Sequence, residues 1–204
     1  MAGKFLDKAY QARDADSTRA LYDDWSASYE AEVAENGYVT PERCATALAQ
    51  FTEDMSAPIL DFGCGTGLSG LALKRAGFAT IDGVDLSSEM LSKAKAKNVY
   101  RNLSIIEADA PLAHKPGNHA ALAAIGVIGA GAAPISVLHT LMRGLGAAGK
   151  LVLSFNDHAL EDPKNEAGLN EWLDCGAATL LFREHGPHLP GIDLKATVYV
   201  IEKT

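Results

Sequence analysis

The feature that most restricts how this chain folds is a glycine-rich turn at residues 61–67, with the sequence DFGCGTG. A short apolar run at residues 58–62 leads into it and predicts a buried strand, whereas residues 68–76 have the apolar spacing of a helix. Glycines at every second position let the backbone turn tightly and approach a ligand, and the start of a helix presents free N–H groups. The turn therefore predicts a strand–loop–helix unit that holds a ligand at its loop.

The same alternation of short apolar runs and amphipathic segments continues along the chain. The predicted strands are residues 58–62, 80–85, 103–107, 120–128, 150–155, 179–184 and 194–202. The predicted helices are residues 16–33, 41–51, 68–76, a segment opened by Ser87, 135–145 and 166–174. Repeated strand–helix units imply an α/β fold with an open, doubly wound, mostly parallel seven-stranded sheet. Residues 185–193, rich in Gly and Pro, are expected to join the last two strands as an antiparallel hairpin.

Composition favours one globular domain over residues 1–204. Within it, the helices predicted before the first strand are expected to form a cap at residues 1–55. The formal net charge of −8 repels phosphate backbones and anionic lipid, so we expect no nucleic-acid or membrane partner. The stretch between Lys115 and Arg143 lacks acidic and basic residues, but its prolines, histidines and glycines argue against a membrane span. Three widely spaced cysteines and the absence of a signal-peptide pattern predict a reducing, cytoplasmic location and no metal site.

The glycine pattern alone leaves two kinds of nucleotide ligand open. Residues 65–70 satisfy the G-x-G-x-x-G dinucleotide pattern, and Asp85 lies where an acid binding the ribose of NAD would sit. Against this, Asp61 at the end of the first strand would face a pyrophosphate unfavourably but suits the ammonium of an amino-acid moiety. The residues that follow Gly70 are used up in completing the sheet, so no separate substrate domain remains for hydride transfer.

The ordered set of motifs resembles the class I S-adenosylmethionine-dependent methyltransferases over residues 21–200. The motifs are the D-x-G-x-G-x-G turn at residues 61–67, Asp85 in GVDLSSEML and Asp109 in IIEADA. The segments YDDWSASYE, GYVTP, NDHALED and HGPHLPGIDLKATVYVIEK are similar to small bacterial proteins akin to methyltransferase-like protein 27. The resemblance implies S-adenosyl-L-methionine as methyl donor, S-adenosyl-L-homocysteine as product and a small-molecule acceptor.

The resemblance also implies a set of cofactor contacts along the carboxyl ends of the strands. Asp61 would order the methionyl ammonium, directly or through water, and Asp85 would take both ribose hydroxyls, because a carboxylate offers several acceptor sites to a vicinal diol. Asp109 would accept from the adenine amino group. The other implied contacts lie in the glycine turn, beside the adenine and at the end of the fourth strand: Gly63, Cys64, Gly65, Leu86, Met90, Ala110 and Ile125 or Gly126.

An aromatic stripe on the first predicted helix, which has Asp16 or Ser17 as its expected N-cap, has two interpretations. Tyr22, Trp25 and Tyr29 follow each other at helical spacing. They either pack the helix on the core or form a lid over the cofactor, where aromatic faces suit a sulfonium and exclude water. Under the lid interpretation, Trp25 and Tyr29 contact the cofactor.

Candidate proton acceptors lie on the loops at the carboxyl ends of the strands: His139, Asn156, Asp157, His158, His185 and His188. His158 is the predicted base, because it follows the fifth strand and its imidazole titrates near neutrality. His185 and His188 are further candidates. In a second interpretation, these two histidines only shape their loop. The segment leading into the fourth strand has His119 where the family often carries an acidic residue, so a non-catalytic cofactor-binding protein stays open beside the methyltransferase and the NAD(P)-dependent oxidoreductase.

Overall fold

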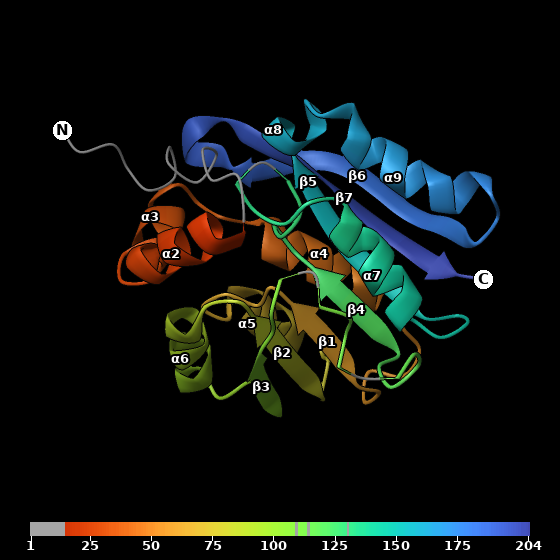
Figure 1. The fold of residues 1–204 in the computed structure, drawn as a ribbon, viewed down its shortest axis with the longest axis horizontal. Coiled ribbons are helices and arrows are strands. Elements are labelled where there is room, and N and C mark those ends of the chain that lie inside the picture. Colours follow the sequence, from red (N-terminus) through yellow and green to blue (C-terminus); the bar gives the residue numbers. More distant parts are fainter. Residues whose placement is uncertain (1–14, 109, 114, 130) are drawn as a thin grey trace.

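A seven-stranded sheet in the order β3-β2-β1-β4-β5-β7-β6 runs through the protein (Figure 1). The computed structural model describes residues 15–108, 110–113, 115–129 and 131–204. The strands are β1 (Ile59–Phe62), β2 (Ile81–Asp85), β3 (Asn102–Ile105), β4 (Ala121–Ala124), β5 (Lys150–Asn156), β6 (Ala178–Leu189) and β7 (Leu194–Lys203). β1 to β5 pair in parallel, and β7 lies antiparallel between β5 and β6. The predicted doubly wound, mostly parallel α/β sheet with antiparallel C-terminal strands is confirmed.

Helices cover both faces of this sheet, because successive side chains of a buried strand point to opposite faces. Ile59 packs in one core cluster with residues of α4 (Thr40–Ala49) and α5 (Leu68–Arg75). The next residue, Leu60, packs in a second cluster with residues of α7 (Ser136–Gly144) and α9 (Pro163–Asp174). The remaining helical elements are α2 (Ala15–Trp25), α3 (Tyr29–Glu35), α6 (Ser88–Ala96), α8 (Asp157–Leu160) and the short 3₁₀ helix η1 (Pro190–Ile192).

The strand order reverses between β1 and β4, the two strands at the centre of the parallel part of the sheet. In open α/β sheets, the loops leaving the carboxyl ends of the strands diverge at such a point and leave a crevice that binds ligands. The α2–α3 pair lies at this end of the molecule, above α6 in Figure 1. The fold therefore places the crevice beneath the N-terminal helices. No helix in the described part of the chain is long and apolar enough to cross a membrane.

The single helix predicted over residues 16–33 is wrong, because the chain forms two helices. α2 ends at Trp25 and α3 begins at Tyr29. Between them the amide of Ser28 donates to the carbonyl of Trp25, closing a turn at 2.9 Å. Serine side chains compete with the helical backbone and favour caps and turns, which explains a break at this point. The predicted N-cap at Asp16 or Ser17 is also wrong, since α2 already begins at Ala15.

The fourth strand is shorter than the predicted 120–128. β4 ends at Ala124, and Gly126 takes a left-handed backbone conformation with φ of +69°. This conformation is accessible to glycine and costly for most other residues, so the apolar run turns away from the sheet. The residues after the turn join the wall of the crevice instead of the sheet.

The predicted loop at residues 185–193 is mostly strand, because β6 continues to Leu189. Pro187 lacks an amide donor, but β6 is the edge strand of the sheet, where proline is tolerated. Arg43 of α4 stabilises the irregular end of this strand by donating to the carbonyl oxygens of Glu184, Pro187 and Ala196 at 2.8–3.0 Å. The other predicted helices and strands begin and end within a few residues of those observed.

A polar cluster around Asp82 lies near the amino ends of the strands, opposite the crevice. The Asp82 carboxylate accepts from Arg101 Nε at 3.0 Å and Asn102 Nδ2 at 2.9 Å, and His119 Nε2 lies 2.9 Å from it. Burial alone would raise the pKa of Asp82, but these hydrogen bonds outweigh it and lower the pKa to about 2. His119, which stands where the family often carries an acidic residue, is part of this structural cluster.

We expect Asp82→Asn to lower the free energy of unfolding at pH 7 by about 1–3 kcal/mol, the range for hydrogen bonds to charged groups. A carboxyl whose pKa is lower in the folded state stabilises the protein above its unfolded pKa, here 3.8, and loses that contribution as the pH falls towards about 2. Urea unfolding at pH 7 and pH 3 should therefore show a smaller pH effect in the variant. Glu42→Gln, which removes an exposed ion pair with Arg75, is the control; an equal loss in both variants contradicts the prediction.

Candidate functional site

The glycine turn between β1 and α5 is bent by three residues with left-handed backbone. Gly63, Gly65 and Gly67 have φ values of +68°, +52° and +92°. The amides of Gly63 and Cys64 both donate to the carbonyl of Val84 in β2, at 2.8 and 3.0 Å. A Cβ added to Gly63 would lie 2.6 Å from Val127, whereas one added to Gly65 would meet no atom within 4 Å. The turn is thus fixed to β2 on one side and open at Gly65 on the other.

Asp85, the last residue of β2, connects the glycine turn to the start of α6. Its Oδ2 accepts from the Gly65 amide at 2.8 Å, and its Oδ1 accepts from the Ser87 amide at 2.9 Å. Ser87 is the N-cap of α6 and accepts from the Met90 amide at 3.0 Å, as the sequence predicted. Burial raises the pKa of Asp85, and the backbone hydrogen bonds from Ser87 and Gly65 oppose that shift. The carboxylate is therefore held in one orientation by two loops.

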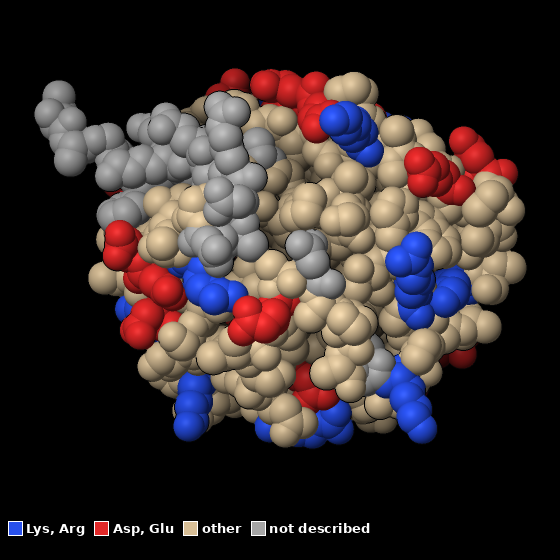
Figure 2. Space-filling model, viewed as in Figure 1, with Lys and Arg blue, Asp and Glu red and all other residues tan. Residues whose placement is uncertain are grey.

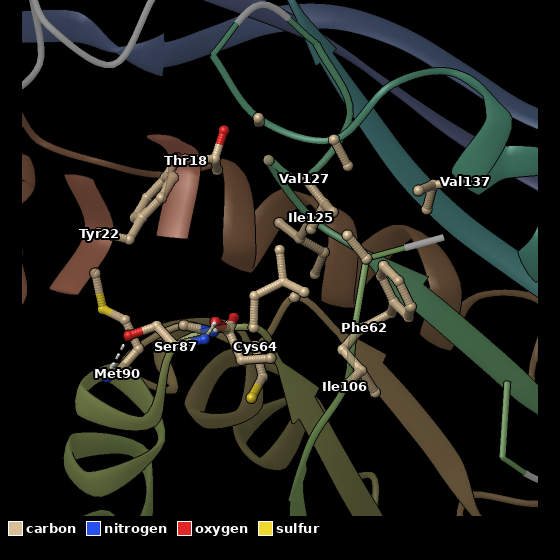
Figure 3. A pocket seen from close by; sticks show the side chains of 18 of the residues that line it. Thr18, Tyr22, Phe62, Cys64, Ser87, Met90, Ile106, Ile125, Val127 and Val137 are labelled. Carbon is tan, nitrogen blue, oxygen red and sulfur yellow. Dashed lines mark hydrogen bonds between the residues drawn. The ribbon is translucent and has the colours of Figure 1, made fainter. Parts of the chain in front are cut away.

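A cavity of about 880 Å³ opens above these loops. Figure 3 shows Ser87, Met90 and Cys64 below it, Thr18 and Tyr22 of α2 on the opposite side, and Ile125 and Val127 between them. Phe62, Ile106 and Val137 form a more distant, apolar part of the wall in the same view. The cavity thus combines a long apolar surface with a few fixed polar groups, which is typical of small-molecule and cofactor sites.

The N-terminal helices are attached to the loops that form the cavity. Ser87 Oγ donates to Asp23 of α2, and Lys97 pairs with Glu30 of α3. Arg19 pairs with Glu107, which follows β3, at 2.8 Å. These contacts hold α2 and α3 against the loops around the cavity.

Asp61 lies behind the glycine turn rather than on the cavity wall. It is fully buried, and its Oδ2 accepts from Ser69 Oγ at 2.6 Å and from Tyr100 Oη at 2.7 Å. Its Oδ1 is buried without a hydrogen-bond partner in the described structure. Burial raises the pKa of Asp61 to about 7, against the lowering effect of the two hydroxyl donors.

Tyr100, which sequence analysis missed, supports the glycine turn from the same side as Asp61. Its hydroxyl also accepts from the Gly70 amide in the first turn of α5, at 3.1 Å. The ring fills the space beside two glycines, since a Cβ would lie 2.3 Å from it at Gly70 and 2.9 Å from it at Gly83. No local pattern marks a tyrosine that precedes a strand as part of a site; only the packed structure shows this role.

Most of the predicted cofactor contacts come together at the large cavity. Its wall includes Tyr29, Gly63, Cys64, Gly65, Asp85, Leu86, Met90, Ala110 and Ile125. Burial raises the pKa of the Cys64 thiol well above its usual value, so this side chain is a neutral filler of the turn. Trp25 lies instead on a second, smaller cavity, and Asp109 lies outside the described residues.

The predicted base, His158, is not brought into either cavity. It lies on α8 with its side chain 44% exposed, and Nδ1 is 3.4 Å from Glu161. His185 is also outside both cavities and pairs with Asp157 at 2.8 Å. His139 lines the large cavity but accepts the indole N–H of Trp172 at its Nδ1, at 2.9 Å. His158 as the base therefore stays a prediction, with its imidazole outside both cavities of the described structure.

The smaller cavity, of about 80 Å³, lies between α2 and α3 on one side and the ends of β4, β5 and β6 on the other. Its wall has six residues in common with that of the large cavity: Tyr22, Tyr29, Tyr38, Gly126, Gly129 and Ala132. Of the histidines predicted as proton acceptors, His188 lines this smaller cavity in the described structure. Tyr38 was missed as a wall residue, although it stands in the GYVTP segment that carries part of the resemblance.

A family model and a curated protein that match this chain in sequence are both described as methyltransferases or methyltransferase-like. Residues 59–149 match the family model described as a methyltransferase domain. Human methyltransferase-like protein 27 is 34% identical over 124 residues, which cover 59% of this chain and 51% of that protein. The chain thus matches about half the length of this curated relative.

Solved structures with low sequence identity share the fold. A TehB-like SAM-dependent methyltransferase from Corynebacterium glutamicum matches with a TM-score of 0.64 and 18% identity, covering 91% of this chain and 99% of that one. A putative Haloferax volcanii methyltransferase, solved with the activator Trm112, matches with a TM-score of 0.65 and 16% identity, covering 88% and 96%. The [4+2]-cyclase SpnF matches with a TM-score of 0.60 and 18% identity, covering 79% and 80%. Residues 59–149 therefore resemble a methyltransferase domain in sequence, and the chain shares the fold of these solved structures.

Proposed function

We propose that this protein is an S-adenosylmethionine-dependent methyltransferase that acts on a small-molecule acceptor. The observation that carries the proposal is the Asp85 carboxylate, fixed by the amides of Gly65 and Ser87 on the wall of the large cavity. A carboxylate has more acceptor sites than these two hydrogen bonds use, so it can still receive both hydroxyls of a ribose. The match of residues 59–149 to the methyltransferase family model favours this interpretation over the NAD(P)-dependent oxidoreductase.

The residues present fit the cofactor at three further points. The backbone at Gly65 borders open space, so a ligand can approach it closely. Leu86 and Met90 supply apolar surface next to Asp85, which suits an adenine ring. The buried Asp61 Oδ1 lacks a hydrogen-bond partner in the described structure, which suits an ammonium group reached through water, because Asp61 is not on the wall itself.

When bound, the cofactor supplies an electrophilic methyl group on a sulfonium. The residues of this chain have to bind, orient and shield it. Asp85 would hold the ribose and the glycine turn the methionyl part, the two groups on either side of the sulfonium, which would set the direction of an in-line attack. Tyr22 and Tyr29 cover the cavity from the N-terminal helices, where they exclude water and present aromatic faces to a positive charge.

We further propose one domain over residues 1–204 with a cap at residues 1–55, no nucleic-acid partner and a cytoplasmic location. The continuous sheet from β1 to β7 supports a single unit. In the view of Figure 2, lysines and arginines stand scattered among acidic and uncharged residues and form no continuous basic patch on that face. The three cysteines are free, two of them buried, which suits a reducing compartment.

Titration calorimetry of the full chain with S-adenosylhomocysteine, NAD and NADP tests the proposal. We expect S-adenosylhomocysteine to bind and both nicotinamide cofactors to give no heat. Incubation with S-adenosylmethionine and a mixture of small acceptors should then release S-adenosylhomocysteine. Binding of a nicotinamide cofactor alone would contradict the proposal. Binding of S-adenosylhomocysteine with no turnover on any acceptor would favour the non-catalytic alternative.

A further inference from the structure

The smaller cavity has a place in the fold that suits an acceptor rather than the cofactor. Gly126 and Ile128 border it after β4, and Ser154 and Asn156 border it at the end of β5. It shares Gly126, one of the two predicted methionyl contacts, with the wall of the large cavity. A molecule in the smaller cavity would therefore lie beside the methionyl part of the cofactor, which is attached to the sulfonium that carries the methyl group. This inference rests on the proposed cofactor site.

The described lining of the smaller cavity contains no Asp, Glu, Lys or Arg side chain. Burying a charged group without a charged or strongly hydrogen-bonded partner is costly. His188 does not change this, because burial lowers the pKa of its imidazole to about 4 and leaves it neutral at neutral pH. Burial likewise raises the pKa of Tyr38, which stays a neutral phenol. The cavity therefore selects an uncharged group.

Three uncharged polar groups on this lining still have hydrogen-bonding capacity. Asn156 Oδ1 accepts from the Ala159 amide at 2.9 Å as the N-cap of α8, so its amide nitrogen keeps its two N–H donors. His188 Nδ1 lies 2.8 Å from Thr40 Oγ1, which leaves Nε2 available. The Tyr38 hydroxyl has no hydrogen bond to a described residue and would lie 2.9 Å from a Cβ at Gly126. These groups match a ligand with one hydroxyl oxygen.

Aromatic rings form part of the remaining enclosure, beside the aliphatic side chains of Val33, Ile128 and Leu189. Trp25 and Tyr29 pack edge to face with ring centroids 4.8 Å apart, and Tyr38 and His188 do so at 5.2 Å. Such walls favour a flat ligand, since aromatic rings gain from offset or edge-to-face contacts. A cavity of about 80 Å³ holds only a few non-hydrogen atoms, so the hydroxyl end of a ring fits there and the remainder extends into the large cavity.

We propose that the smaller cavity is the acceptor subsite and that it takes the uncharged hydroxyl group of a flat, unsaturated ring, a phenol or enol. Asn156 and Tyr38 hydrogen-bond the oxygen, and the neutral His188 Nε2 accepts a hydrogen bond from its O–H in the tautomer that keeps Nδ1–H on Thr40. The new bond joins this oxygen to the methyl carbon. The bond that breaks is the donor's S–CH₃ bond, whose electron pair stays on sulfur; the hydroxyl proton is released to water.

Binding of three matched probes to the full chain, saturated with S-adenosylhomocysteine, tests this assignment. Phenol, benzoate and benzylammonium have the same ring and differ in the charge of the group that would enter the cavity. We expect phenol to bind by calorimetry or saturation-transfer NMR, and both ions to bind about 10-fold more weakly or worse, as expected for an unpaired buried charge. Equal or tighter binding of either ion overturns the proposal, as does an absence of phenol binding.

One variant tests whether the charged probe binds in the smaller cavity or elsewhere on the protein. Asn156→Asp keeps the acceptor that caps α8 and places a carboxylate on the lining, so benzylammonium should gain about 10-fold in affinity. Asn118→Asp adds the same charge at an exposed position outside both cavities and is the control. Equal gains in the two variants, or no gain in Asn156→Asp, contradict the proposal. If S-adenosylhomocysteine itself fails to bind, the proposed function fails first; if it binds and phenol does not, only the acceptor assignment fails.

Discussion

Asp85→Ala is expected to weaken S-adenosylhomocysteine binding by about 10- to 100-fold, the effect of losing hydrogen bonds to a charged group. The loss has two physical sources. The ribose hydroxyls lose their acceptor, and the amides of Gly65 and Ser87 lose the carboxylate that joins the two loops. Because both amides border a cavity that water can enter, the cost in folding free energy should stay small.

Calorimetry of the wild type, Asp85→Ala and Asp85→Asn measures this effect, with urea unfolding as a check on stability. Asp85→Asn keeps the shape and one acceptor oxygen, so its affinity should fall between the other two. Glu89→Ala, an exposed acid in the first turn of α6, removes a nearby negative charge without touching the cavity and should bind like the wild type. A similar loss in Glu89→Ala would assign the effect to long-range charge and contradict the role of Asp85.

Sequence patterns predicted the parts of this protein that depend on local chemistry. The strand before the glycine turn, the acid that ends β2 and the Ser87 cap of α6 each depend on residues close in sequence, and the structure places all three as expected. Most of the predicted cofactor contacts then meet at one cavity, because the carboxyl ends of parallel strands share an edge of the sheet.

The differences between expectation and structure arise where distant residues decide the conformation. β6 continues through Gly186 and Pro187, which read as a loop, because Arg43 from α4 binds its carbonyl oxygens. A Cβ at Gly186 would lie 2.9 Å from the Arg43 guanidinium, so a larger residue there would displace this group. His158 follows β5 in sequence as predicted, but the short helix α8 carries it to the surface. Neither the extension of β6 nor the exposure of His158 is indicated by the sequence within a few residues of the position.

Tyr100 is the clearest case of a site residue that sequence could not reveal. Its hydroxyl joins three parts of the chain: it donates to Asp61 in β1, accepts from the Gly70 amide in α5 and itself stands just before β3. Burial raises the pKa of this hydroxyl, so it remains a donor at neutral pH. The Tyr100 ring fills the space beside Gly70 and Gly83. Nothing in the sequence around these two glycines indicates that a ring packs against them.

Tyr100→Phe should lower the free energy of unfolding by about 1–3 kcal/mol and weaken S-adenosylhomocysteine binding, because it leaves the Gly70 amide unpaired and Asp61 with one donor fewer. The stability loss should depend on pH. Burial holds the pKa of Asp61 at about 7, above its unfolded value of 3.8, so folding is favoured by a protonated Asp61 and becomes less favourable as the pH rises towards 7. Since the missing hydroxyl stabilised the ionised form most, the difference between variant and wild type should be larger at pH 8 than at pH 5.

Urea unfolding at the two pH values, together with calorimetry of S-adenosylhomocysteine, separates this role from simple packing. Tyr199→Phe is the matched control, because its hydroxyl donates to Glu166 at 2.7 Å in the other core cluster, away from the glycine turn. We expect that control to lose stability to a similar extent at pH 5 and pH 8 and to bind the ligand like the wild type. If Tyr100→Phe behaves in the same way, Tyr100 only fills space, and the orientation of the glycine turn must depend on Ser69 and the backbone contacts to β2 alone.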